Sequence, residues 1–178
     1  MSGVLSGDFG PSFRFPGRSV SEMIATGLPV TFELAFYAIL IALLIGVSSG
    51  VLAALKRNTY LDFIPMAIAM IGICVPTFLM GPLLVLIFGI NLEILPVSGW
   101  GQLAGDKILP SITLGFAYAA YIARLSRGGM LEVLNQDFIR TARAKGLTER
   151  NVVIKHAMQG GLIPVVSFLG PAIAGLLA

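Results

Sequence analysis

Four stretches of this chain are nearly free of charged residues, and each has about the length that a helix needs to cross a lipid bilayer. They cover residues 28–55, 63–90, 108–126 and 151–178. About 20 apolar residues cross a hydrocarbon core of about 30 Å, and a helix satisfies its own backbone hydrogen bonds there. The sequence therefore predicts an all-α polytopic membrane protein, with an outer segment over 1–27 and a transmembrane domain over 28–178.

Composition supports this class, because 56% of the residues are hydrophobic and only 12% are charged, whereas an ordinary soluble domain is about a quarter charged. The single cysteine, Cys74, allows no internal disulfide. The first 28 residues lack the pattern of a signal peptide. The last apolar stretch ends without an aromatic belt, flanking charge or polar tail. We expect the chain to be an internal part of a longer membrane protein. The helices at both ends of that protein would then be missing from this sequence.

Basic residues predict the orientation. Seven of the twelve Lys and Arg residues lie between Arg124 and Lys155, and Lys56 and Arg57 follow the first stretch. Cytoplasmic loops of membrane proteins carry such an excess. The loop that carries Lys56 and Arg57 and the loop region between Arg124 and Lys155 are therefore expected to be cytoplasmic, and the loop 91–107 is expected to lie outside with the first segment.

Several glycines and prolines within the apolar stretches suggest close helix packing or breaks in a helix. Gly46 and Gly50 have the spacing that lets two helices approach closely. Pro65, Pro76 and Pro82 each remove a helical hydrogen bond if they lie beyond a first turn, so the second stretch is expected to be kinked or locally broken.

Four residues are candidates for a translocation pathway: Glu33, Pro76, Thr77 and Gly81. Broken backbone at membrane depth is tolerated where it faces a cavity, although a plain kink is an equal alternative. Glu33 has the alternative of a structural acid that reaches the outer interface or a partner.

A short basic segment lies between the third and fourth stretches, from Gln136 to Gly146. Its pattern predicts an amphipathic helix that Asp137 caps and Gly146 ends, since glycine tolerates the left-handed conformation that often ends helices. Such a helix either docks a partner or simply anchors the topology at an anionic membrane surface. Residue spacing leaves both readings open.

The sequence of this segment resembles that of the cytoplasmic loop of importer permeases of the ATP-binding cassette (ABC) class. The resemblance rests on Asp137-Phe-Ile-Arg-Thr-Ala-Arg-Ala-Lys-Gly-Leu147, His156-Ala157 and Pro164-Val165, with further matches such as Gly7-Asp-Phe-Gly-Pro-Ser-Phe13, Pro76-Thr-Phe78 and Leu95-Pro-Val-Ser-Gly99. The peptide and nickel branch is the most similar, and within it the B-type membrane subunit of oligopeptide permeases. Gly160-Gly161 departs from that branch, which usually carries a bulkier or amide side chain there.

This resemblance implies a partial type I ABC importer permease fold, of the kind found in methionine importers, and a coupling helix over 136–146. The coupling helix would dock on an ATPase subunit through Asp137, Phe138, Ile139, Arg140, Thr141, Ala142, Arg143, Ala144, Lys145 and Gly146. The implied location of this chain is the bacterial inner (cytoplasmic) membrane, which it crosses several times. The implied partners are a second, different permease subunit, two ATP-binding subunits and an extracytoplasmic peptide-binding protein. The implied substrate is an oligopeptide or dipeptide. Replacing Ala142 with Trp, or Gly146 with a β-branched residue, is expected to uncouple transport without preventing membrane insertion.

Other classes of function fit the residues less well. The chain has no Gly-x-x-x-x-Gly-Lys-[Ser/Thr] phosphate loop, so ATP and Mg²⁺ are expected on partner subunits, with no cofactor or metal bound by this chain. An ion-coupled secondary transporter would normally place ionisable residues near the midplane, where this chain offers little beyond Glu33. A hydrolase would need a nucleophile with its base or a metal cluster, and one His and one Cys in different stretches do not supply it.

Overall fold

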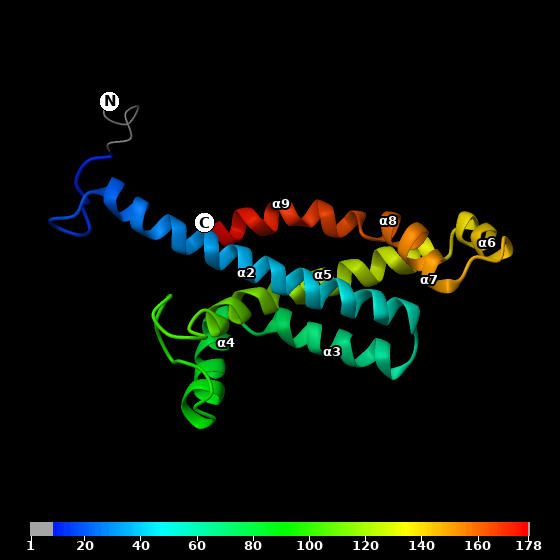
Figure 1. The fold of residues 1–178 in the computed structure, drawn as a ribbon, viewed down its shortest axis with the longest axis horizontal. Coiled ribbons are helices and arrows are strands. Elements are labelled where there is room, and N and C mark those ends of the chain that lie inside the picture. Colours follow the sequence, from blue (N-terminus) through cyan, green and yellow to red (C-terminus); the bar gives the residue numbers. More distant parts are fainter. Residues whose placement is uncertain (1–8, 178) are drawn as a thin grey trace.

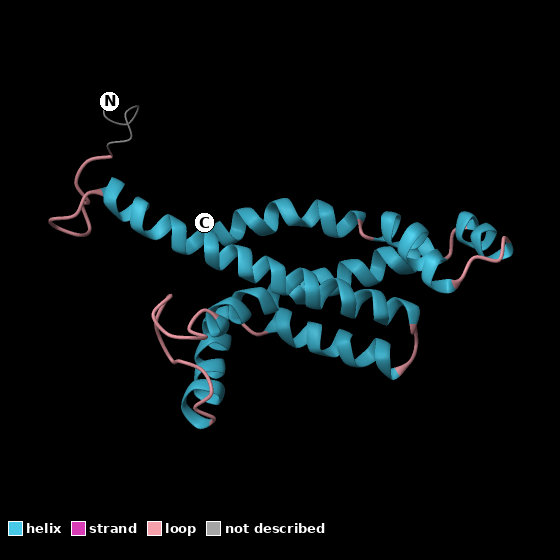
Figure 2. Cartoon of the chain, viewed as in Figure 1, coloured by secondary structure: helices cyan, strands magenta, loops and turns pink. Residues whose placement is uncertain are grey.

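The computed structural model describes residues 9–177, and the regular elements in that range are all helices. Figures 1 and 2 show them as an elongated bundle with a loop region at one end and a compact helical corner at the other. The elements are α2 (Val20–Leu55), α3 (Tyr60–Cys74), α4 (Thr77–Leu84), the π-helix η1 (Val85–Asn91), α5 (Ile108–Leu134), α6 (Asp137–Ala144), α7 (Glu149–Asn151), the π-helix η2 (Val152–Ala157), α8 (Met158–Gly161) and α9 (Ile163–Leu177). The all-α prediction is confirmed.

Helices α2 and α5 form the axis of the bundle and run in the same direction (Figure 1). A side chain at Gly115 would meet Ala38, whereas one at Gly46 would meet Ala119 and Ile122 further along both helices. Helices α3 and α9 pack against α5 in the opposite direction. This alternation is the one that four successive crossings would give.

Within residues 9–177, two helices, α2 with 36 residues and α5 with 27, are each long and apolar enough to cross a membrane, and two bent helix pairs would bring the number to four. Helix α2 begins eight residues before the predicted stretch, because the Ser19 side chain caps it by accepting a hydrogen bond from the Glu22 N–H. The predicted outer segment 1–27 therefore ends in a helix. Helix α5 continues to Leu134, past the predicted end at residue 126.

The second apolar stretch is broken, as its prolines predicted. Helix α3 ends at Cys74, Pro76 is the N-cap of α4, and the two helical parts are bent by 109°. Pro65 and Pro82 lie inside helices that continue past them. Only the break at Pro76 redirects the chain, and in Figure 1 the green segment around α4 stands across the other helices.

The last stretch is also bent, by 50° between Gly161 and Ile163. The backbone of Gly161 lies directly against Gly129 of α5: a Cβ at Gly129 would collide with the Gly161 carbonyl oxygen, and a Cβ at Gly161 would collide with the Met130 sulfur. The unusual Gly160-Gly161 pair thus sits where the final helices cross α5 most closely. The sequence analysis noted that this glycine pair departs from the peptide and nickel branch. The close crossing with α5 explains why small residues are needed here.

Candidate coupling surface and outer cavity

Helix α6 is held by a small apolar core at the corner of the bundle. Ile139 is fully buried and Ala142 is 6% exposed, and both join a cluster with Met130 and Val133 of α5 and Val152 of η2. Because α6 packs on the ends of the long helices, a load on α6 reaches them through buried side chains rather than through a free loop.

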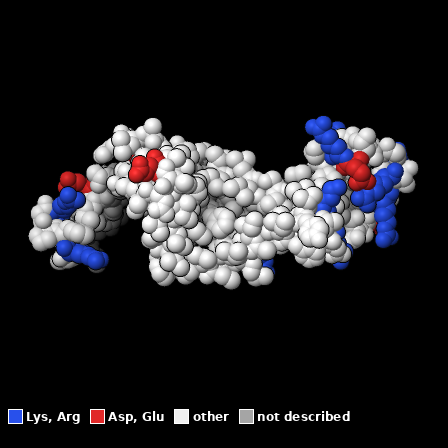
Figure 3. Space-filling view, turned by 90° about the horizontal axis from the view of Figure 1, so that it is seen from below, with Lys and Arg blue, Asp and Glu red and all other residues white. Residues whose placement is uncertain are grey.

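The rest of α6 and its C-terminal turn faces outward. Asp137, Phe138, Arg140, Thr141, Arg143, Ala144, Lys145 and Gly146 are exposed. Figure 3 shows Lys and Arg side chains gathered densely at one end of the molecule, with Asp and Glu among them and few charges in the middle. Arg140 pairs with Asp137 at 3.2 Å, and Arg143 pairs with Glu149 through two hydrogen bonds of 2.8 and 3.3 Å. Exposed pairs of this kind contribute little to stability, so they remain open to exchange with a partner.

Two details of the predicted helix are wrong. Gln136, and not Asp137, occupies the N-cap position, and its side chain makes no capping hydrogen bond. Asp137 is the first helical residue, where its charge still opposes the positive end of the helix dipole. Ile139 and Ala142 point into the protein's own core, so they position α6 and are not part of its exposed face. Ala142→Trp would consequently overfill that core, and it cannot serve as a test of docking alone.

The end of α6 is built as the sequence predicted. Gly146 has φ 79°, in the left-handed region. Its N–H donates to the Arg143 carbonyl at 2.9 Å, and the Leu147 N–H donates to the Ala142 carbonyl at 3.4 Å. This is the Schellman arrangement, which satisfies carbonyls at a helix end and fixes the exit of the chain.

A buried ion pair near the same end of the bundle was missed by the sequence analysis. The Arg127 guanidinium of α5 donates to both carboxylate oxygens of Asp62 on α3, at 2.5 and 2.7 Å, and the Asn58 N–H donates to Asp62 at 3.0 Å. Asp62 is 1% exposed and Arg127 is 28% exposed. The pair joins α3 to α5 across 65 residues of sequence, and no local pattern signals it.

Glu33 lies in a polar cluster at the opposite end. Its carboxylate accepts hydrogen bonds from Lys107 at 2.5 Å and from the Trp100 indole N–H at 3.2 Å. The Lys107 ammonium also lies 5.4 Å from the Trp100 ring centroid. The Glu33 carboxylate holds the pKa of Lys107 above its usual value. This geometry matches the structural alternative for Glu33, in which it ties the outer loop to α2.

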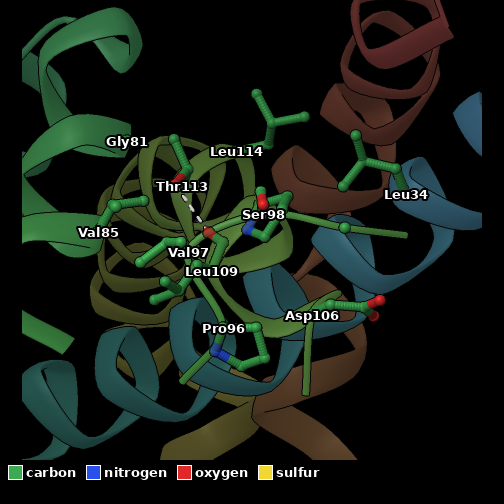
Figure 4. A pocket seen from close by; sticks show the side chains of 12 residues that line it. Leu34, Gly81, Val85, Pro96, Val97, Ser98, Asp106, Leu109, Thr113 and Leu114 are labelled. Atoms are coloured by element: carbon green, nitrogen blue, oxygen red, sulfur yellow. Dashed lines mark hydrogen bonds between the residues drawn. The ribbon is translucent and has the colours of Figure 1, made fainter. Parts of the chain in front are cut away.

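A cavity of 290 Å³ lies between α4, α5 and the outer loop (Figure 4). Of the four pathway candidates, only Gly81 lines it, with Thr113 of α5 3.5 Å from the place of a Cβ. Pro76 and Thr77 form the break that turns α4 toward this region. The four candidates therefore lie in three different places. Pro76 and Thr77 form the break in the backbone, Gly81 lines the cavity, and Glu33 belongs to the outer ion pair.

The chain matches the family described as binding-protein-dependent transport system inner membrane component over residues 46–178. It belongs to this family. The described residues carry the long apolar helices that an inner-membrane component requires, and the resemblance to ABC importer permeases is confirmed.

Named relatives extend over almost all of the chain. The oligopeptide transport system permease protein OppB of Salmonella typhimurium is 48% identical over 175 residues, which is 98% of this chain and 57% of the relative. OppB of Haemophilus influenzae is 46% identical over 99% of this chain and 58% of its own length, and the dipeptide transport system permease protein DppB of Bacillus subtilis is 42% identical over 99% and 57%. The chain thus spans a little over half the length of these relatives.

Proposed function

We propose that this chain forms part of the membrane-spanning permease of an importer that moves oligopeptides or dipeptides into the cytoplasm. The relatives are oligopeptide and dipeptide permease proteins, and the matched family is binding-protein-dependent. The single observation that carries the mechanism is the exposed basic face of α6, mounted on a buried core at the ends of the long helices. In this proposal α6 is the coupling helix.

The proposed partners are two ATP-hydrolysing subunits that press on α6, a second permease subunit, and an external peptide-binding protein. ATP and Mg²⁺ would be bound by the ATPase subunits. Shifting the ratio of two pore conformations from about 1:99 to 99:1 requires that the partner bind the favoured conformation more tightly by roughly 5.5 kcal/mol. A helix that contacts its partner through charged and apolar side chains can deliver this energy because its buried side fixes its position.

The mechanical step follows from the packing. Movement of α6 displaces Ile139, which contacts the ends of α5 and η2 in one buried cluster. The load then reaches α3 through the Arg127–Asp62 pair and the close α5–α3 packing. Beyond α3 lies the break at Pro76, where α4 turns toward the cavity lined by Gly81. We propose this route for the conversion of ATPase closure into pore movement.

Reversing two charges on the exposed face tests the docking. Arg140→Glu combined with Lys145→Glu is expected to abolish copurification of the ATPase subunits and peptide uptake, while the amount of inserted permease stays unchanged because both side chains lie outside the core. Arg14→Glu combined with Arg18→Glu is the matched control, since both residues are exposed at the other end of the chain. Equal ATPase copurification by the two double variants would contradict the proposal.

Gly146→Val provides a second test of the coupling role of α6, because the substitution introduces no steric clash. Nothing lies within 4 Å of a Cβ at Gly146, but its φ of 79° is strained for a β-branched residue. We expect ATPase subunits to remain bound while peptide uptake per ATP hydrolysed falls. Uptake by vesicles that needs only an ion gradient, without ATP or binding protein, would instead favour the secondary transporter.

A further inference from the structure

We propose that the α6 end of α2 carries a site for one anionic phospholipid of the cytoplasmic leaflet. The site consists of an apolar groove along α2 and a basic hollow at its end. The inference does not depend on the proposed transport function, because it concerns the surface of the chain in its membrane.

The groove has the chemistry and length of an acyl-chain site. It has a volume of 460 Å³ and runs along α2 from Leu43 to Leu55, with Met158 of α8 on its other side. Its one hydroxyl, that of Ser48, donates to the Leu44 carbonyl within the same helix, so the groove presents no unpaired donor. Twelve helical steps rise about 18 Å, which is close to the roughly 15 Å of one leaflet's hydrocarbon.

The hollow continues the groove at a basic end. It has a volume of 440 Å³ and shares Leu55 with the groove, while Val153 and Ile154 form its apolar wall. Lys56 and Arg150 line it as well. Within residues 9–177, the four ion pairs involve neither Lys56 nor Arg150. The one carboxylate in the lining, Glu149, accepts two hydrogen bonds from Arg143.

Charge complementarity selects the occupant. A zwitterionic headgroup would gain little from two adjacent cations, whereas an anionic headgroup gains from both, and basic pockets on the cytoplasmic side of membrane helices favour such lipids. Another helix would fill the apolar groove, but it would gain nothing from the exposed Lys56 and Arg150 unless it carried an acid at that level. The joined groove and hollow therefore fit a phospholipid with an anionic headgroup best.

Lipid retention by the assembled transporter tests the site. The purified complex is offered equal amounts of phosphatidylglycerol and phosphatidylcholine with identical acyl chains, and native mass spectrometry counts the bound lipids. We expect one phosphatidylglycerol to be retained preferentially. Lys56→Gln combined with Arg150→Gln should reduce this preference about 25-fold, since each charge near the membrane surface contributes about fivefold. Arg124→Gln combined with Lys155→Gln removes the same charges from exposed positions outside the hollow and should leave the preference intact.

The remaining arms distinguish other occupants. Leu52→Trp fills the groove and should release the lipid while Lys56 and Arg150 remain. Soluble glycerol phosphate that competes as well as phosphatidylglycerol would show a free-phosphate site and overturn the proposal. Retention by the isolated chain but not by the assembled transporter would show that protein covers the groove, which also overturns it. Equal loss of preference in both double-Gln variants would reduce the effect to general surface charge and would contradict a specific site.

Discussion

At the scale of single residues, Asp62 is the most deeply buried acid of the part that the structure describes, at 1% exposed. A buried carboxylate is costly unless it is paired and hydrogen-bonded, and Arg127 with the Asn58 N–H provides both conditions. Removing only the cation leaves that charge without compensation. The pair is therefore more important for what its loss would cost than for any net stabilisation it adds.

Arg127→Met is expected to lower the free energy of unfolding by about 3 kcal/mol, because it leaves Asp62 buried and unpaired. The measurement is SDS-induced unfolding of the purified protein. Asp62→Leu combined with Arg127→Met removes both charges and should recover most of the loss. A double variant no more stable than Arg127→Met would show that the ion pair itself, rather than the orphaned charge, supplies the stability.

Asp106 predicts a pH dependence of the outer loop. Its carboxylate accepts hydrogen bonds from the Leu103 N–H at 3.1 Å and the Gln102 N–H at 2.9 Å, which hold its pKa below the usual value. A lowered folded-state pKa gives stability that is present above about pH 4 and is lost as the pH falls through the folded-state value. The fluorescence of Trp100, the only tryptophan, should report this loss. Asp106→Asn should remove that step.

At the scale of the elements, close crossings depend on glycines that face a neighbouring backbone. Gly50 lies against Ala123 and Ser126 of α5, so a Cβ there would be 2.6 Å from the Ser126 Cβ. The small-residue spacing had suggested a packing role for Gly46 and Gly50, and the structure places both against α5. It did not identify α5 as the partner, because spacing within one helix carries no information about its neighbour.

Gly50→Ala should destabilise the protein by about 1–3 kcal/mol through overpacking. Gly128→Ala is its control, because Gly128 is also helical but has nothing within 4 Å of the added Cβ. There the gain in helix propensity should stabilise by up to about 1 kcal/mol. SDS-induced unfolding of both variants gives the comparison. Similar shifts in the same direction would contradict the role of close packing at Gly50.

The long helices were predictable because apolar length alone requires them, and the left-handed end of α6 was predictable because Gly146 follows a short basic helix. The broken second stretch was also expected, although its three prolines did not reveal that only Pro76 would redirect the chain. The Asp62–Arg127 pair and the inward face of α6 were not predictable. Both depend on which helices become neighbours, and helical periodicity does not encode this.

At the scale of the whole molecule, charge and packing agree on one direction for each crossing. The Glu33–Lys107 pair ties the first half of α2 to the start of α5, and the Asp62–Arg127 pair ties the start of α3 to the far part of α5. The contacts thus place the outer loop at one end of the bundle and α6 at the other. Basic residues gather at the α6 end (Figure 3), which the positive-inside rule assigns to the cytoplasm.

This orientation predicts which positions a membrane-impermeant thiol reagent reaches from outside the cell. In a Cys74→Ser background, which removes the one thiol of this sequence, Leu103→Cys should be labelled in intact cells, since Leu103 is 59% exposed in the outer loop. Arg140→Cys on α6 should be labelled only after the membrane is permeabilised. Labelling of both in permeabilised cells controls for reactivity. The reverse pattern would invert the topology, and α6 would then face away from the cytoplasmic ATP that the proposed coupling mechanism requires.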